Sequence, residues 1–151
     1  MASIAVTIVR ALLGLLFVVF GLNGLIMLTT GSGLLPMPPA APAMAAWSAA
    51  MFQAGYLLPL VKVLEVAGGL MLLTGRYPRL GIVLLAPIVV NILGTHLALD
   101  PAGAPMALGL TAMTAFLIYH EWNFFRGVFA YRTTTPYQGE ESHAQHSVQK
   151  A

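Results

Sequence analysis

Four long apolar stretches dominate the pattern of hydrophobic and polar positions along the chain. They cover about residues 4–28, 56–75, 80–99 and 105–122, each near the ~20 residues that a helix needs to cross a hydrocarbon core. None shows the strict alternation of apolar and polar positions that marks a half-buried strand. Because backbone groups in lipid must be paired, these unbroken runs predict helices. The expected fold is an all-α, integral membrane four-helix bundle.

The connections differ in length. Tyr77 and Pro78 form a short turn before the third stretch, and Asp100 ends that stretch because the residue before a proline is biased away from helix. The first connection is the longest, and residues 33–42 contain four prolines. After them, three large apolar side chains recur at helical spacing: Met44, Trp47 and Met51. We expect a short helix in the outer membrane interface, with a plain loop as the alternative.

The composition supports a lipid environment. Hydrophobic residues make up 58% of the 151 residues and charged residues 8%, whereas a soluble domain has about 25% charged residues. The net charge of +2 is too small to indicate a nucleic-acid partner. The absence of cysteine excludes thiol–disulfide chemistry, cysteine-bound clusters and covalently attached c-type haem.

The basic residues predict the orientation of the bundle. Lys and Arg are missing from the first and third connections, and all basic residues but Lys62 fall on one side of the expected membrane: Arg10, Arg76, Arg79, Arg126, Arg132 and Lys150. The positive-inside rule then places both ends in the cytoplasm. We expect a multi-pass protein of a bacterial or archaeal cytoplasmic membrane. Residues 1–132 are the expected transmembrane domain, and the polar segment 133–151 is a disordered cytoplasmic tail.

Polar side chains inside the apolar stretches are the candidate site residues. A charge at mid-membrane costs roughly 2.5–3.5 kcal/mol on insertion scales, so each needs a reason to be there. The set comprises Arg10, Asn23, Lys62, Glu65, Asn91 and His96. We expect Arg10 to pair with Glu65, since a lone buried charge is costly. Lys62 is then expected to point outward, toward Asn23, Asn91, His96 or Asp100.

Three interpretations of this polar cluster remain open. It is a structural network that sets the helix register, a pocket for a small polar headgroup such as a quinone ring, or a proton or ion path. His96 and His120 fall near opposite membrane surfaces and therefore cannot bracket one haem, and we predict neither haem nor metal. No phosphate-binding loop, nucleophile elbow or zincin helix is present in the sequence.

Four segments resemble the DoxX and DoxX-like family of small membrane proteins. They are RALLGLLFVVFGLNG (10–24), GLLPMP (33–38), KVLEVAGGLMLLTGR (62–76) and LAPIVVNILGTHLALDP (85–101). The resemblance extends over about residues 10–122. It implies a four-helix membrane bundle and an association with quinol oxidase, with thiosulfate:quinone oxidoreductase or with membrane complexes of oxidative stress. It implies no catalytic residues; what transfers is the matched set of six polar positions.

Three functions compete. The preferred one is a small subunit of a quinone-linked redox complex, or a protein that itself binds quinone in an apolar slot with a few hydrogen-bond donors. Lys62, Asn91 and His96 are the expected donors, and electrons must come from a partner protein. The second is a carrier of lipids or small hydrophobic molecules, with the proline-rich connection as its lid. The third is a non-catalytic assembly subunit. The glycine face of the first helix serves either internal packing or homo-oligomerisation.

Overall fold

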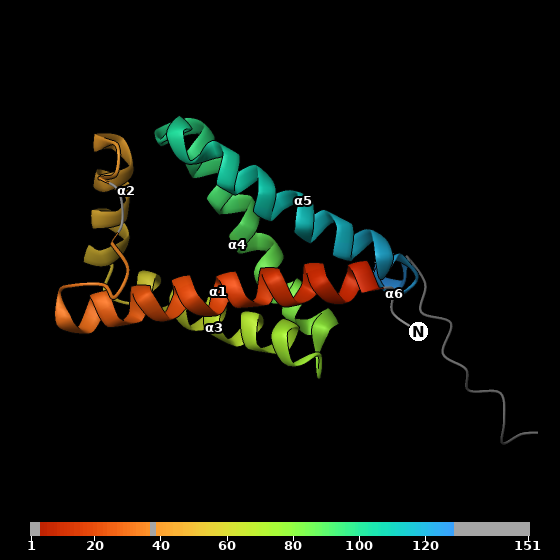
Figure 1. The fold of residues 1–151 in the computed structure, drawn as a ribbon. Coiled ribbons are helices and arrows are strands. Elements are labelled where there is room, and N and C mark those ends of the chain that lie inside the picture. The colour runs from red at the N-terminus through yellow and green to blue at the C-terminus, as the bar shows by residue number, and fades with distance from the viewer. Residues whose placement is uncertain (1–3, 37–38, 129–151) are drawn as a thin grey trace, which may run out of the picture.

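The computed structural model describes residues 4–36 and 39–128, and within them the chain is helical and has no strand. Figure 1 shows the order of the elements along the chain. The helices are α1 (Ile4–Thr30), α2 (Pro42–Gln53), α3 (Leu57–Thr74), α4 (Pro78–Leu99), the 3-10 helix η1 (Pro101–Gly103), α5 (Ala104–His120) and α6 (Trp122–Val128). The prediction of an all-α fold is confirmed. The predicted tail, 133–151, lies outside the described residues.

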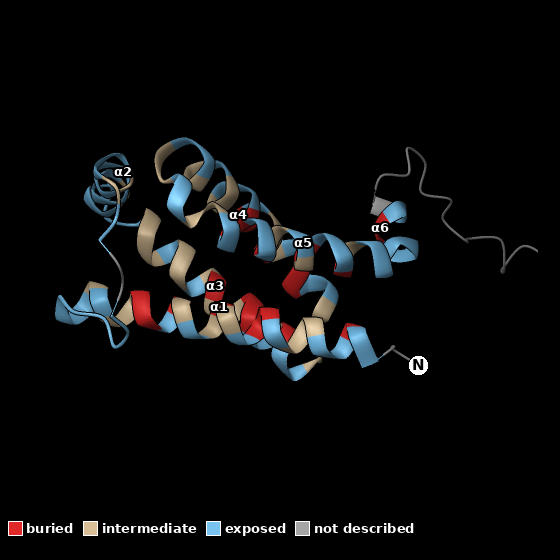
Figure 2. Cartoon of the chain, turned by 45° about the horizontal axis from the view of Figure 1, so that its top comes forward, coloured by how far each residue is buried: buried red, intermediate tan, exposed pale blue. Residues whose placement is uncertain are grey.

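Within the described residues, four helical segments are long and apolar enough to cross a membrane: α1, α3, α4, and η1 together with α5. They carry many exposed large apolar side chains, including Leu12 on α1, Val90 on α4 and Leu108 on α5. Figure 2 shows exposed positions along all of these helices. Such an apolar surface suits lipid better than water and is consistent with a multi-pass membrane protein. Which side each end faces remains a prediction.

Glycine residues let α1 and α3 pack backbone to backbone. Gly14 of α1 and Gly69 of α3 approach so closely that a Cβ added to either would lie 2.8 Å from the carbonyl oxygen of the other. α3 meets α4 in a similar way on an adjoining face, where Gly68 lies against Leu85 and Gly81 lies against the Gly68 carbonyl oxygen. Small residues at such crossings allow close van der Waals packing, which holds helices together in lipid. The predicted packing role of the α1 glycine face is borne out inside one chain.

The helices form two neighbouring pairs. α1 lies beside α3, and α4 lies beside α5, in both Figure 1 and Figure 2. The shared core contains Leu13 and Phe17 of α1, Leu72 of α3 and Leu85 of α4. α5 completes it with Leu110 and Leu117. This arrangement places the middle of α3 between α1 and α4.

α2 lies outside the core of the four long helices and covers one end of two of them. It runs across the direction of α1 (Figure 1) and packs against α3 and α4. Pro42 opens it at the first turn, where a missing N–H costs no helical hydrogen bond. None of its residues is buried. A short helix forms where the spacing of Met44, Trp47 and Met51 predicted one; its position at a membrane interface remains a prediction.

The beginning of α4 is tied to the beginning of α6. Arg79 Nε donates a hydrogen bond of 2.7 Å to Glu121 Oε2, and the Arg79 guanidinium lies 4.8 Å from the centre of the Phe124 ring. Phe124 and Phe125 meet edge to face, with ring centroids 5.4 Å apart. Phe125 is buried in the core, whereas Phe124 is exposed. The Phe125 ring therefore packs inside the bundle, whereas Phe124 lies at the surface beside the Arg79 guanidinium.

Candidate functional site

An ion pair between a partly buried lysine and a buried glutamate on α3 forms the centre of the candidate site. Lys62 Nζ donates to both carboxylate oxygens of Glu65, at 2.9 and 2.8 Å, and Glu65 is only 3% exposed. The two residues are three apart and thus neighbours on one helix face. Gly24 of α1 lies against the aliphatic stem of Lys62, and Gly21 lies against the Cβ of Glu65. The α1 glycines thus leave room for two charged side chains between packed helices.

The expected pairing of Arg10 with Glu65 is wrong. The Arg10 guanidinium lies near Gly75, at the end of α3, where a Cβ on that glycine would be 2.9 to 3.0 Å from its atoms. Gly75 is ten residues beyond Glu65, about 15 Å along a helix. Lys62 reaches Glu65 within one helical turn and needs no tertiary partner. Arg10 Nε is buried and has no hydrogen-bond partner among the described residues.

Two cavities meet at the ion pair. The smaller one, of about 210 Å³, lies among α1, α3, α4 and α5. The larger one, of about 430 Å³, lies among α2, α3 and α4. Four residues line both of them: Lys62, Glu65, Ile92 and His96. A molecule in either cavity therefore meets the same polar groups.

The cavities differ in their remaining walls. Beyond the four shared residues, the smaller cavity is lined by apolar side chains: Leu16, Phe17, Phe20, Met106 and Leu110. The larger cavity adds the polar side chains of Ser48, Asn91 and Thr95. α2 contributes Ser48 and three apolar side chains to it: Met44, Trp47 and Met51. An apolar chamber and a more polar, α2-covered chamber thus lie on either side of Lys62 and Glu65.

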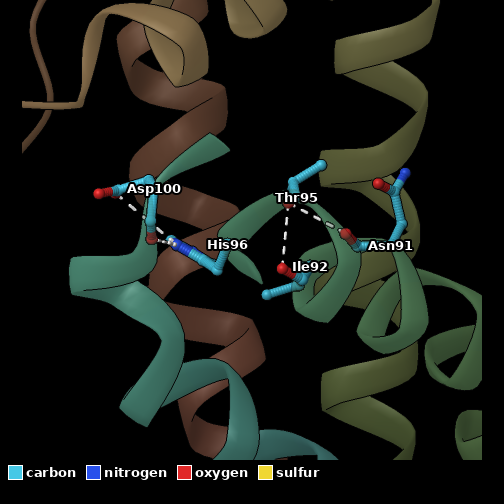
Figure 3. Close-up of polar contacts among 5 residues, drawn as sticks. All are labelled: Asn91, Ile92, Thr95, His96 and Asp100. Atoms are coloured by element: carbon cyan, nitrogen blue, oxygen red, sulfur yellow. Dashed lines mark hydrogen bonds and ion pairs between the residues drawn. The ribbon is translucent and has the colours of Figure 1, made fainter. Parts of the chain in front are cut away.

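His96 is held at the corner between α4 and η1. Figure 3 shows its ring turned toward Asp100, with Nδ1 3.3 Å from the Asp100 carbonyl oxygen and 3.7 Å from carboxylate Oδ2. A Cβ added to Gly103 would overlap Nδ1 and Cε1 of the ring. The η1 backbone therefore covers this edge of the imidazole. Sequence reasoning missed Gly103, although its place just after the Asp100–Pro101 helix stop marks it as a turn residue.

Asn23 and Asn91 do not belong to one polar cluster with common partners. Each lies in different surroundings. Asn23 is buried, and its Oδ1 accepts a 2.8 Å hydrogen bond from the Leu35 backbone N–H. It also lies against Gly33, so it anchors the first connection to α1. Asn91 is exposed and lines the larger cavity. In Figure 3 its side chain points away from His96 and Asp100. Of the six predicted residues, Lys62, Glu65, Asn91 and His96 share one cavity.

No family model, curated protein or solved structure matches this chain. The resemblance to the DoxX family therefore stays an expectation that rests on the four quoted segments.

The site offers both hydrogen-bond donors and an acceptor. Lys62 has three N–H groups, of which Glu65 engages two, so one remains for another partner. The Asn91 amide supplies donors to the larger cavity. Nε2 of His96 makes no hydrogen bond within the described residues and is not sealed from solvent. Apolar walls with a few polar groups of this kind are typical of sites for small hydrophobic ligands.

Proposed function

We propose that this protein is a small membrane protein that binds a quinone-type molecule, as a subunit or close partner of a quinone-linked redox complex. The observation that carries the proposal is the meeting of two cavities at Lys62, Glu65 and His96. A quinone combines an apolar tail with a compact ring that bears two oxygens. The smaller, apolar chamber suits the tail, and the larger chamber under α2, which carries more polar groups, suits the ring.

The size of the larger cavity supports a small lipophilic ligand. The larger cavity, of about 430 Å³, falls within the roughly 300–1,000 Å³ of small-molecule sites. The free N–H of Lys62 and the Asn91 amide would donate to ring oxygens. Because the chain contains no cysteine, the thiol relays of many oxidoreductases are excluded, and electrons would come from a partner oxidoreductase. The DoxX resemblance supports the same quinone link and the cytoplasmic membrane of a bacterium or archaeon.

A purely structural function has one specific observation in its favour. Lys62 already satisfies both carboxylate oxygens of Glu65, so the pair needs no ligand. In an assembly subunit, this pair would only hold α3 in register against α1. Such a protein would keep no quinone, and mutation at the cavities would change stability alone.

The deciding experiment measures the lipids and quinones that remain bound when the protein is purified in native-membrane discs. Ile92 lines both cavities, whereas Val90 on the same helix is 68% exposed. We expect mass spectrometry to find a quinone near one per chain in the wild type and in Val90→Trp, and little in Ile92→Trp. Absence of quinone from the folded wild type would exclude quinone binding. Retention of assorted lipids in its place would support a carrier.

A further inference from the structure

The surroundings of His96 determine which ring nitrogen carries its proton. Nδ1 faces the carbonyl oxygen of Asp100 at 3.3 Å and carboxylate Oδ2 at 3.7 Å. That carbonyl oxygen also accepts the Gly103 N–H at 3.1 Å. Carbonyl and carboxylate oxygens accept hydrogen bonds and cannot donate them. In the neutral imidazole, the proton therefore lies on Nδ1, where it faces these oxygens.

The opposite nitrogen is then an acceptor. With the proton on Nδ1, Nε2 of the neutral ring has a lone pair and no hydrogen. The η1 backbone covers the Nδ1–Cε1 edge, since a Cβ on Gly103 would overlap it. Nε2 has no partner in the described part of the chain, and His96 lines both cavities. The nitrogen left for a ligand is thus one that must receive a hydrogen bond.

We propose that the site selects the reduced, hydroxyl-bearing form of its ligand, a hydroquinone or another lipophilic phenol, through O–H donation to Nε2 of His96. This inference rests on the proposed function and adds to it which redox form is held. A phenolic hydroxyl donates to Nε2, and its oxygen still accepts from the free N–H of Lys62. The free N–H of Lys62 and Nε2 of His96 would then each have a hydrogen-bond partner.

The oxidised form lacks this match. A quinone oxygen has lone pairs but no hydrogen. Beside Nε2, both atoms would be hydrogen-bond acceptors, and no hydrogen bond could form between them. One lost hydrogen bond together with an unsatisfied acceptor corresponds to a preference of roughly tenfold for the reduced form. For the same reason, the site should bind a phenol more tightly than its methyl ether. The two compounds differ little in shape and do not exchange electrons.

The test compares ligands that differ in one hydrogen-bond donor. The purified protein in lipid discs is titrated with 4-decylphenol and 4-decylanisole, and, without oxygen, with a decyl-hydroquinone and its quinone. We expect the hydroxyl compounds to bind about tenfold more tightly than their partners. In His96→Gln the side-chain amide both donates and accepts hydrogen bonds. The ratio of the two affinities should therefore fall close to one. His120→Gln, which changes a histidine at the end of α5 outside both cavities, should keep it.

A second measurement follows the proton itself. In ¹⁵N-histidine-labelled protein, the signal that disappears in His96→Gln should show a protonated Nδ1 and an unprotonated Nε2. Equal binding of phenol and ether, or a proton on Nε2, would overturn the selection while leaving a ligand site in place. If neither hydroquinone nor quinone binds, the proposed function fails, and this inference fails with it.

Discussion

Gly14 of α1 and Gly69 of α3 each occupy the space that a side chain on the other would need. A Cβ on either residue would lie 2.8 Å from the carbonyl oxygen of its counterpart, closer than real Cβ contacts come. The obstacle is backbone on both sides, so rotation of a flexible side chain cannot relieve it. This contact sets the spacing between α1 and α3, and with it the width of the space that Lys62 and Glu65 occupy.

We therefore expect Gly14→Leu or Gly69→Leu to destabilise the protein by at least about 1–3 kcal/mol, the usual cost of overpacking. The measurement is the free energy of unfolding in a denaturant titration in detergent. Gly109→Leu on α5 is the matched control, because no atom lies within 4 Å of a Cβ built there. Equal losses at positions 14 and 109 would show that the α1–α3 contact does not limit stability.

The ion pair predicts strong coupling between two substitutions. Lys62→Met leaves Glu65 buried without a counter-charge, which costs about 3–5 kcal/mol in comparable buried pairs. Lys62→Met combined with Glu65→Leu removes both charges and should restore most of that stability. A double-mutant cycle on the free energies of unfolding measures the coupling. Simple additivity of the two losses would mean that the charges do not interact in the folded protein.

Gly103→Ala should disturb His96 directly. The new methyl group would overlap Nδ1 and Cε1 of the ring, so either the ring or η1 must move. We expect a loss of about 1–3 kcal/mol in stability and a weaker preference for hydroxyl-bearing ligands. Gly94→Ala on α4 meets no atom within 4 Å and serves as the control. Binding and stability equal to those of Gly94→Ala would show that the His96 corner adapts freely.

The Arg79–Glu121 pair should contribute little by comparison. The Arg79 side chain is 54% exposed, and solvent screens charges in such pairs, which leaves about 0–1 kcal/mol. We expect Arg79→Gln, which removes the positive charge, to cost less than 1 kcal/mol at low salt and still less at high salt. Unfolding at two ionic strengths measures this. A loss that is large and independent of salt would point instead to the contact between Arg79 and the Phe124 ring.

Single cysteine substitutions can test the orientation in the membrane. The chain contains no cysteine, so an introduced thiol is the only one that a reagent can label. Ser32→Cys and Ala102→Cys lie in the first and third connections, and Tyr77→Cys lies in the second. With both ends in the cytoplasm, a membrane-impermeant maleimide should label positions 32 and 102 in intact cells. Position 77 should react only after the membrane is opened. The reverse pattern would invert the predicted topology.

The sequence predicts the helices better than it predicts their pairing. The apolar runs and the Pro–Gly boundaries are local signals, so the four long helices and α2 lie close to where the pattern placed them. The prediction that Arg10 pairs with Glu65 was wrong because it needed the axial offset between the antiparallel helices α1 and α3. No local sequence signal contains that offset. The pair that forms, Lys62 with Glu65, is itself local, three residues apart on one helix face.

The cavities lie beyond what the pattern of residues can predict. They depend on how far α2 leans over α3 and α4, and on a glycine contact between η1 and His96. Both are results of tertiary packing. The partner of each polar residue depends on the same packing: Asn23 accepts a hydrogen bond from the backbone of Leu35, and Asn91 lies exposed at a cavity wall.

α2 has one more consequence, which concerns engineering. The glycines that bracket it, Gly31 and Gly55, have positive φ values of 79° and 78°, and no atom approaches within 4 Å of a Cβ at either. The helix contributes no buried residue to the core, yet it supplies several walls of the larger cavity. Under the proposed function, ligand recognition would be separated from folding: a different twelve-residue helix in place of Pro42–Gln53 would reshape the larger cavity and leave the bundle that supports it unchanged.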